Sequence, residues 1–211
     1  MPLATSVVTP ERFEQGLRYA DFLAQATVNR DKFELYYKDS PLSSDDIAFF
    51  KKAAALPGGP AKILAIAEAW CGDVYRELPT VARIAEASGM DLRIFLRDQN
   101  PDIMDEFLSN DGQSRAIPVF VFHTKETRYI AHFTERSAAA HAELAAIMDQ
   151  VASEMNLPRG TTFRTASAAA RQEFIQKVIA GITPRYPEWR KQSIREMRAL
   201  LATTLSISNH E

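Results

Sequence analysis

The chain has 211 residues, of which 46% are hydrophobic and 25% are charged, and its formal net charge is −2. This length and hydrophobic content are enough for one well-buried core. The charge shows no basic excess, and no apolar run approaches the ~20 residues that a membrane-spanning helix needs. We therefore expect neither a nucleic-acid partner nor a membrane partner.

The first part of the chain predicts helices. Thr9 places a capping hydroxyl before Pro10, which is favoured at the first helical position. One helix is expected from here, because apolar residues follow at helical spacing: Phe13, Leu17, Ala20, Leu23 and Ala24. The period is unclear over 33–37, and a second helix is expected from Ser43 to the residue before Pro57.

The middle of the chain predicts strands that alternate with helices. A buried strand over 61–67 follows the breaker at 57–60, and helical spacing of apolar residues follows over 75–87. Another strand is expected over 91–96, where Leu92, Ile94 and Leu96 alternate with polar or exposed positions. A short helix over 101–108 and a loop over 109–114 come next.

The last part predicts a hairpin and three helices. Residues 119–123 and 128–133 form the hairpin, with its turn near 125–126. A long helix is expected from Ser137 through Met155, then two helices at about 165–181 and 185–204, separated by Pro184 and Pro187. This order implies an α/β fold with a mixed central sheet and helices on both faces.

The only cysteine of the chain, Cys71, lies between the strand over 61–67 and the helix that follows it. A thiol at such a junction lies near the amide N–H groups at the positive end of a helix, which stabilise the thiolate. The thiolate is the nucleophilic form, so Cys71 is a candidate nucleophile. The alternative interpretation is a buried spacer, because cysteine is commonly buried.

Two segments resemble the thioredoxin superfamily. Thioredoxins read Trp-Cys-Gly-Pro-Cys where this chain reads Trp70-Cys71-Gly72-Asp73-Val74, so the match fails at the second cysteine. Residues 115–122, Arg-Ala-Ile-Pro-Val-Phe-Val-Phe, look like the segment that ends in the cis-proline of the superfamily and enters the next strand. The separation of the two motifs, 118 − 71 = 47 residues, suits one helix, one strand and one short helix.

The resemblance implies a single thioredoxin-like domain over residues 1–211. Its core is expected at about 55–157, with helical extensions over 1–54 and 158–211. The phrases at 97–105 and 113–118 look most like a bacterial thioredoxin-like family with extra helices at both ends.

The resemblance also implies the site. Cys71 is the expected catalytic residue, and the substrate-binding residues are Trp70, Gly72, Asp73, Ile117 and Pro118. A cis Pro118 would place the Ile117 backbone beside Cys71, open to pair with an extended peptide. An ordinary trans proline at a strand start and a Trp70 that only fills the core are the alternatives.

The chain departs from the family pattern at the positions that complete disulfide exchange. Val74 cannot resolve a mixed disulfide, and Ala65 stands where thioredoxins carry a buried acid, six residues before the nucleophile. Glu68 is three residues from that position and falls on the other side-chain face of the strand. Asp73 suits a helix start, but its charge opposes the thiolate and would raise the pKa of Cys71.

Two functions stay open from the sequence. The first is a monothiol redox protein, in which Cys71 attacks a disulfide or oxidised partner and an external protein thiol or low-molecular-weight thiol regenerates it. The second is a redox-inactive binding module for a peptide or protein partner. The alkylation rate of Cys71 as a function of pH distinguishes them, since a low pKa favours redox chemistry.

No cofactor and no metal are expected. The four histidines, His123, His132, His141 and His210, have no acidic or cysteine partner at ligand spacing. The turn at 57–60 lacks the Gly-Lys-Ser/Thr ending of a phosphate-binding loop. A single cysteine cannot form an internal disulfide, which fits a reducing compartment, and residues 1–9 lack the features of a secretory signal. We therefore expect a cytoplasmic protein, and the sequence favours no oligomeric state.

Overall fold

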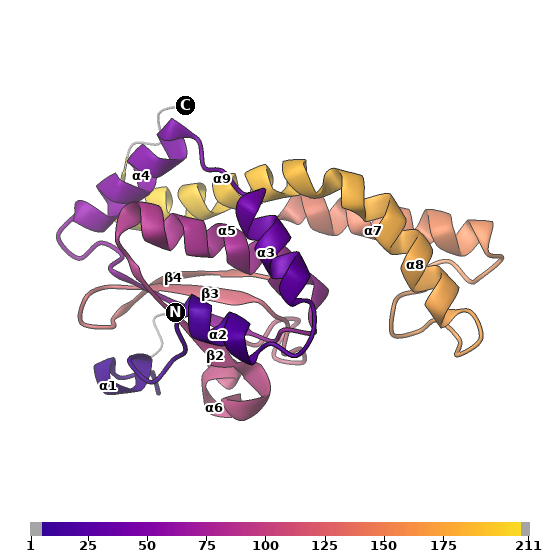
Figure 1. Ribbon diagram of the computed structural model, residues 1–211, viewed down its shortest axis with the longest axis horizontal. Helices are drawn as coiled ribbons and strands as arrows, with labels where there is room; N and C mark the ends of the chain where they lie inside the picture. Colours follow the sequence, from indigo (N-terminus) through magenta and orange to yellow (C-terminus); the bar gives the residue numbers. More distant parts are fainter. Residues whose placement is uncertain (1–5, 208–211) are drawn as a thin grey trace. The chain divides into compact units, whose positions relative to one another are not determined.

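The structure, a computed structural model, describes residues 6–207, and these form two compact units. One unit runs to Glu135 and resumes at Ile194, and the other comprises Arg136–Ser193. The helices and strands of the two units are, in chain order (Figure 1): α1 (Pro10–Phe13), α2 (Tyr19–Gln25), α3 (Arg30–Lys38), α4 (Ser44–Ala55), β1 (Lys62–Ala67), α5 (Gly72–Ser88), β2 (Asp91–Leu96), η1 (Arg97–Gln99), α6 (Pro101–Met104), η2 (Asp105–Phe107), β3 (Val119–His123), β4 (Tyr129–Thr134), α7 (Ala138–Glu154), α8 (Arg171–Ile182), η3 (Thr183–Arg185) and α9 (Tyr186–Leu205).

The first unit is built on a mixed four-stranded sheet in the order β2-β1-β3-β4. β1 pairs with β2 in parallel and with β3 in antiparallel orientation, and β3 pairs with β4 as an antiparallel hairpin. The helix α5 connects the two parallel strands and contacts both of them, as well as α3 and α4. A mixed sheet flanked by helices was the expected fold class, and the structure confirms it.

The strand β2 is buried more completely than its alternating pattern predicts. Arg93 and Phe95 were expected on a polar or exposed face, but both are buried. The cause is the chain before α2, which covers the outer edge of this strand. A β-carbon added at Gly16 would lie 2.6 Å from the Phe95 ring, so only glycine allows this close approach.

The prediction of one continuous helix after Pro10 is wrong. The helix is divided into α1 and α2, and between them Leu17 forms an isolated antiparallel bridge with Ile94. The amide N of each residue lies 2.8 Å from the carbonyl O of the other. These hydrogen bonds satisfy backbone groups on the outer edge of β2. Helical spacing over a few residues cannot indicate them, because the two partners are far apart in the sequence.

The helices before the sheet pack on α5 through aromatic side chains. The segment 33–37, whose period was unclear, lies in α3, where Phe33 is fully buried and contacts Phe22 edge to face. The predicted second helix is confirmed as α4, and the Ser43 hydroxyl accepts a hydrogen bond from the Asp46 amide at 3.1 Å.

The second unit contains α7, α8 and the first turns of α9. Ser137 caps α7 as expected, because its hydroxyl accepts from the Ala140 amide at 3.2 Å. α8 begins later than predicted: at 162–165 the Thr162 amide donates to the Thr165 hydroxyl at 2.8 Å, a local bond that competes with helix. Pro187 also does not separate the last helices, since it lies in the first turn of α9, where proline is tolerated.

Candidate functional site

Cys71 is the N-cap residue of α5, the helix that follows the buried strand β1. Its backbone is extended, with φ −80° and ψ 128°, and its side chain makes no capping hydrogen bond. The thiol is half-buried and donates a weak hydrogen bond to the carbonyl oxygen of Ile117, with 3.6 Å between Sγ and O. The thiol therefore lies at the positive end of a helix, where a thiolate is stabilised.

The pairing of β1 with β3 brings the two motifs together. Ile66, near the end of β1, is in register with Val119 at the start of β3, so the residues just beyond them meet at the same edge. The peptide bond between Ile117 and Pro118 is cis, as the resemblance implies. The Ile117 backbone therefore lies beside Cys71, although both the Ile117 and Pro118 side chains are buried.

Trp70 is exposed rather than a filler of the core, since 53% of its surface is accessible. The Arg97 guanidinium lies over its ring, 4.9 Å from the ring centroid. Arg97 also donates to the carbonyl oxygen of Arg115 at 3.4 Å, which connects the Trp70 side chain to the segment that leads into Ile117. A large apolar ring is thus held at the surface beside the thiol.

The turn that carries Cys71 is fixed by hydrogen bonds from two sides. The Asn29 amide donates to the carbonyl oxygen of Ala69 at 2.9 Å, and Lys32 donates to the Asn29 side chain at 2.9 Å. The Cys71 amide donates to the carbonyl oxygen of Glu68 at 3.1 Å. The Glu68 carboxylate accepts from the Asp98 amide at 3.0 Å, so it holds the neighbouring loop.

Asp73 lies in the first turn of α5 and forms an ion pair with Arg76, with 3.2 Å between Oδ1 and Nη1. Both side chains are largely buried, with exposed fractions of 15% for Asp73 and 11% for Arg76. The sequence places the Asp73 charge beside Cys71, where it opposes the thiolate. The structure adds a cation at the same turn, because Arg76 pairs with this carboxylate.

The two positions that differ from the family pattern are part of the core. Val74 and Ala65 are both fully buried. In the sheet, Ala65 is in register with Ile94 on one side and Phe120 on the other, and both neighbours are buried hydrophobic residues. The site therefore has apolar packing at the positions of a resolving thiol and of a proton-transferring acid.

Nothing in residues 6–207 groups three or more histidine, cysteine, aspartate or glutamate side chains that could hold a metal ion. Burial lowers the pKa of His132, and burial together with the charge of Lys62 lowers the pKa of His123 to about 4. His141 is an exposed residue of α7, and His210 lies outside the described residues. None of the helices in the described part of the chain is long and apolar enough to cross a membrane.

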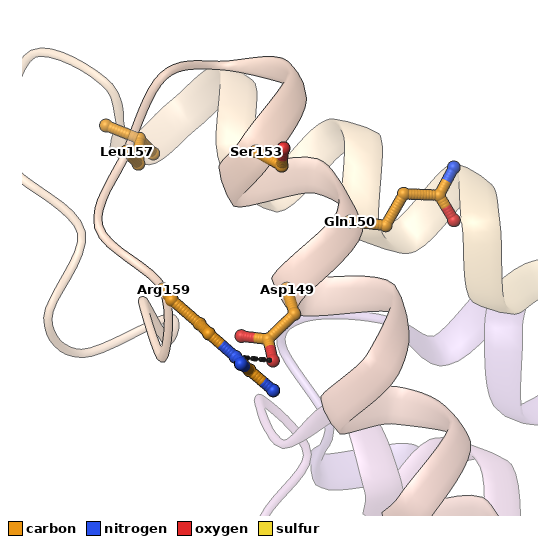
Figure 2. A pocket seen from close by; sticks show the side chains of 5 residues that line it. All are labelled: Asp149, Gln150, Ser153, Leu157 and Arg159. Carbon is orange, nitrogen blue, oxygen red and sulfur yellow. Dashed lines mark hydrogen bonds and ion pairs between the residues drawn. The ribbon is translucent and has the colours of Figure 1, made fainter.

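The second unit carries a shallow cavity of about 430 Å³ at the end of α7 (Figure 2). Its lining residues are Asp149, Gln150, Ser153, Leu157 and Arg159. Figure 2 shows Arg159 directed at Asp149, and the Nε–Oδ2 distance of this ion pair is 3.3 Å. Asp149 also accepts from the Gly160 amide at 2.9 Å, so these polar groups hold the loop after α7.

Comparison with known proteins identifies the family. A family model described as Thioredoxin matches residues 16–152, so the chain belongs to this family. The match begins well before the part of the chain that resembles thioredoxin most clearly by sequence. A search of curated proteins found no similar sequence.

Two solved structures share the fold. A protein of unknown function from Pseudomonas aeruginosa is 13% identical, covers 93% of this chain and 98% of its own length, and has a TM-score of 0.58. An HIV epitope-scaffold is 14% identical, covers 94% of this chain and 99% of its own length, and has a TM-score of 0.57. At these identities the likeness establishes the fold alone. The matched part of this chain includes residues of both terminal extensions, because the matches cover 93% and 94% of it.

Four residues that contact the Cys71 turn or support those contacts were not named as candidates from the sequence: Asn29, Lys32, Arg76 and Arg97. Only Arg76 had a local signal, since an acid and a base three residues apart lie on one helix face. Asn29 and Lys32 approach from a distant helix, so no spacing in the sequence indicates them.

Proposed function

We propose that this protein is a monothiol thiol–disulfide redox protein in which Cys71 is the nucleophile. The observation that carries the proposal is the position of its half-buried thiol, at the N-terminus of α5 and beside the backbone of the cis-proline segment. Such a position stabilises the thiolate that attacks sulfur. The fold alone would not support this function, because one fold hosts many activities.

The reaction proceeds in two exchanges. The Cys71 thiolate attacks one sulfur of a disulfide, forms a mixed disulfide with it and expels the other sulfur as a thiolate. A second thiolate, from a protein or a low-molecular-weight thiol, then attacks the mixed disulfide at the substrate sulfur or at Cys71 Sγ. Attack at the substrate sulfur releases Cys71 as a thiolate. Attack at Cys71 Sγ releases the substrate and leaves Cys71 in a mixed disulfide with the second thiol. Electrons balance in both exchanges, since one disulfide is broken for each one formed.

The external thiol is required because Val74 stands at the resolving position and is buried in the core. A pool of reduced thiols exists in reducing compartments, so we propose the cytoplasm as the location. The exposed ring of Trp70 beside the thiol offers an apolar contact for the substrate, and the Ile117 segment offers a backbone edge.

A second function, a redox-inactive binding module, is favoured by the same exposed ring. Trp70 is accessible over 53% of its surface and is held by Arg97, which suits a docking contact that needs no thiol chemistry. In this function Cys71 is chemically idle and its hydrogen bond to the Ile117 carbonyl oxygen is only structural.

Alkylation of Cys71 by iodoacetamide between pH 5 and 10 separates the two functions. An apparent pKa well below the ordinary value of ~8.5 supports the redox function. An apparent pKa at or above that value contradicts it and leaves the binding module. The Cys71→Ser variant is the control for reaction at other side chains.

A further inference from the structure

The guanidinium of Arg76 lies against the first turn of α5. A β-carbon added at Gly72 would lie 3.4 Å from both Nη1 and Nη2 of Arg76, so the cation is next to the residue that follows Cys71. Nη1 is also 3.2 Å from Oδ1 of Asp73. The side chain reaches back along the helix to its N-terminus, where few cations are found because the helix dipole disfavours them.

Packing holds Arg76 in this position. Nη2 donates to the Tyr75 hydroxyl at 3.3 Å, and the guanidinium carbon lies 5.1 Å from the centroid of the Tyr75 ring. Tyr75 is buried and stacks on Tyr36 with 6.0 Å between ring centroids. The cation is therefore fixed before any substrate arrives, and only 11% of its side chain is exposed.

The N-terminus of α5, the Ile117 carbonyl oxygen and the Asp73 carboxylate each act on the charge of Cys71. The N-terminus of α5 favours the thiolate, whereas the Ile117 carbonyl oxygen accepts a bond from the neutral thiol and favours the protonated form. The Asp73 carboxylate also disfavours the thiolate, because like charges repel. Without a counter-charge, Asp73 would cancel much of what the helix contributes.

We propose that Arg76 is a positioning residue for the thiol chemistry of Cys71. It neutralises Asp73 and holds that carboxylate in an ion pair, so that the thiol ionises although an acid lies two residues away. This inference rests on the proposed redox function, and it explains how an aspartate is compatible with a nucleophilic cysteine at this turn.

The test is a double-mutant cycle on the pKa of Cys71. Iodoacetamide alkylation rates are measured against pH for the unmodified protein, Arg76→Gln, Asp73→Asn and the double variant. We expect Arg76→Gln to raise the apparent pKa by about one unit, which slows alkylation by up to about tenfold at pH values below the pKa of the unmodified protein. Asp73→Asn should lower the apparent pKa, and in its presence Arg76→Gln should have a much smaller effect.

Arg128→Gln is the matched control, because Arg128 is exposed and pairs with Glu126 at 3.7 Å in the turn between β3 and β4. It should leave the alkylation profile unchanged. Circular dichroism checks that each variant folds, and Arg76→Met replaces Arg76→Gln in the cycle if the latter does not fold. An unchanged pKa in the Arg76 variant, or the same rise in the Asp73→Asn background, would overturn the inference.

The failure of this inference can be distinguished from the failure of the proposed function. The unmodified protein alone tests the function through its absolute pKa. The differences among the variants test the role of Arg76, whatever that absolute value is.

Discussion

The two sides of the turn that carries Cys71 differ in what they keep of the family pattern. On the side of the thiol, Cys71 is the N-cap residue of α5 and Trp70 is exposed. The Ile117 carbonyl oxygen, next to the cis Ile117–Pro118 bond, lies 3.6 Å from Sγ. On the resolving side, Val74 and Ala65 are buried among hydrophobic residues. The difference teaches that one fold can keep a thiol at a helix N-terminus beside the cis-proline segment without the second thiol and the buried acid of the family pattern.

The strongest way to break this comparison is to restore the resolving thiol. Val74→Cys places a second sulfur three residues after Cys71 and makes the release of product intramolecular, which raises its rate through high effective concentration. We expect insulin reduction, measured by turbidity with an external reductant present, to rise about a hundredfold over that of the unmodified protein. Equal turnover of the two forms would contradict the account.

Cys71→Ser is the matched control and should abolish thiol chemistry in either background. It should not impair folding, because Cys71 makes no capping hydrogen bond and serine is a favoured N-cap residue. We expect the free energy of unfolding, measured in urea, to be unchanged or up to about 1 kcal/mol higher.

The next prediction tests how dry the interior of the sheet is. His123 is 99% buried (1% exposed), its Nδ1 atom has no hydrogen-bond partner among the described residues, and its pKa is lowered to about 4 by burial and by the charge of Lys62. The unfolded chain takes up a proton near the ordinary pKa of 6.5, whereas the folded protein does not until about 4. Stability should therefore fall as the pH decreases from 6.5 to 4, by about 2 kcal/mol at pH 5.

Urea unfolding between pH 7 and pH 5 measures this loss. His123→Asn should remove most of the pH dependence, since asparagine does not titrate in this range. His141→Asn, at an exposed position of α7, should retain it. If the His123 variant keeps the full pH dependence of the free energy of unfolding, burial of His123 is not its cause and the prediction is wrong.

The smallest effect is expected at the exposed ring on the side of the thiol. Trp70→Ala removes a side chain that is 53% accessible, so the free energy of unfolding should change by no more than about 0.5 kcal/mol. Its contact with a substrate should be lost, and mixed-disulfide formation with an extended peptide should slow by about threefold to tenfold. A large loss of stability with no change in that rate would place Trp70 in the core instead.

The sequence predicted the elements of the fold whose position depends on residues close together in the chain. The strands β1 and β3, the capped helices α4 and α7 and the proline before β3 each have an uninterrupted signal within a few residues. The division of α1 from α2 was not predictable in this way. It depends on Leu17 bonding to Ile94, which is distant in the sequence.

The site divides in the same manner. Cys71, Trp70 and Pro118 were named as candidates because their neighbours in the sequence carry a recognisable motif. The pairing of Asp73 with Arg76 was missed because spacing allows such a contact without deciding which way the arginine turns. Asn29 was missed because only the folded chain brings α3 to Ala69.

The lifetime of the mixed disulfide tests the central claim most directly. The reduced protein is treated with a small excess of a low-molecular-weight disulfide, and its intact mass is followed after the excess is removed. We predict one adduct, at Cys71, that persists for hours and disappears when an external thiol is added. Failure to form an adduct, or loss of the adduct without an added thiol, would contradict the account.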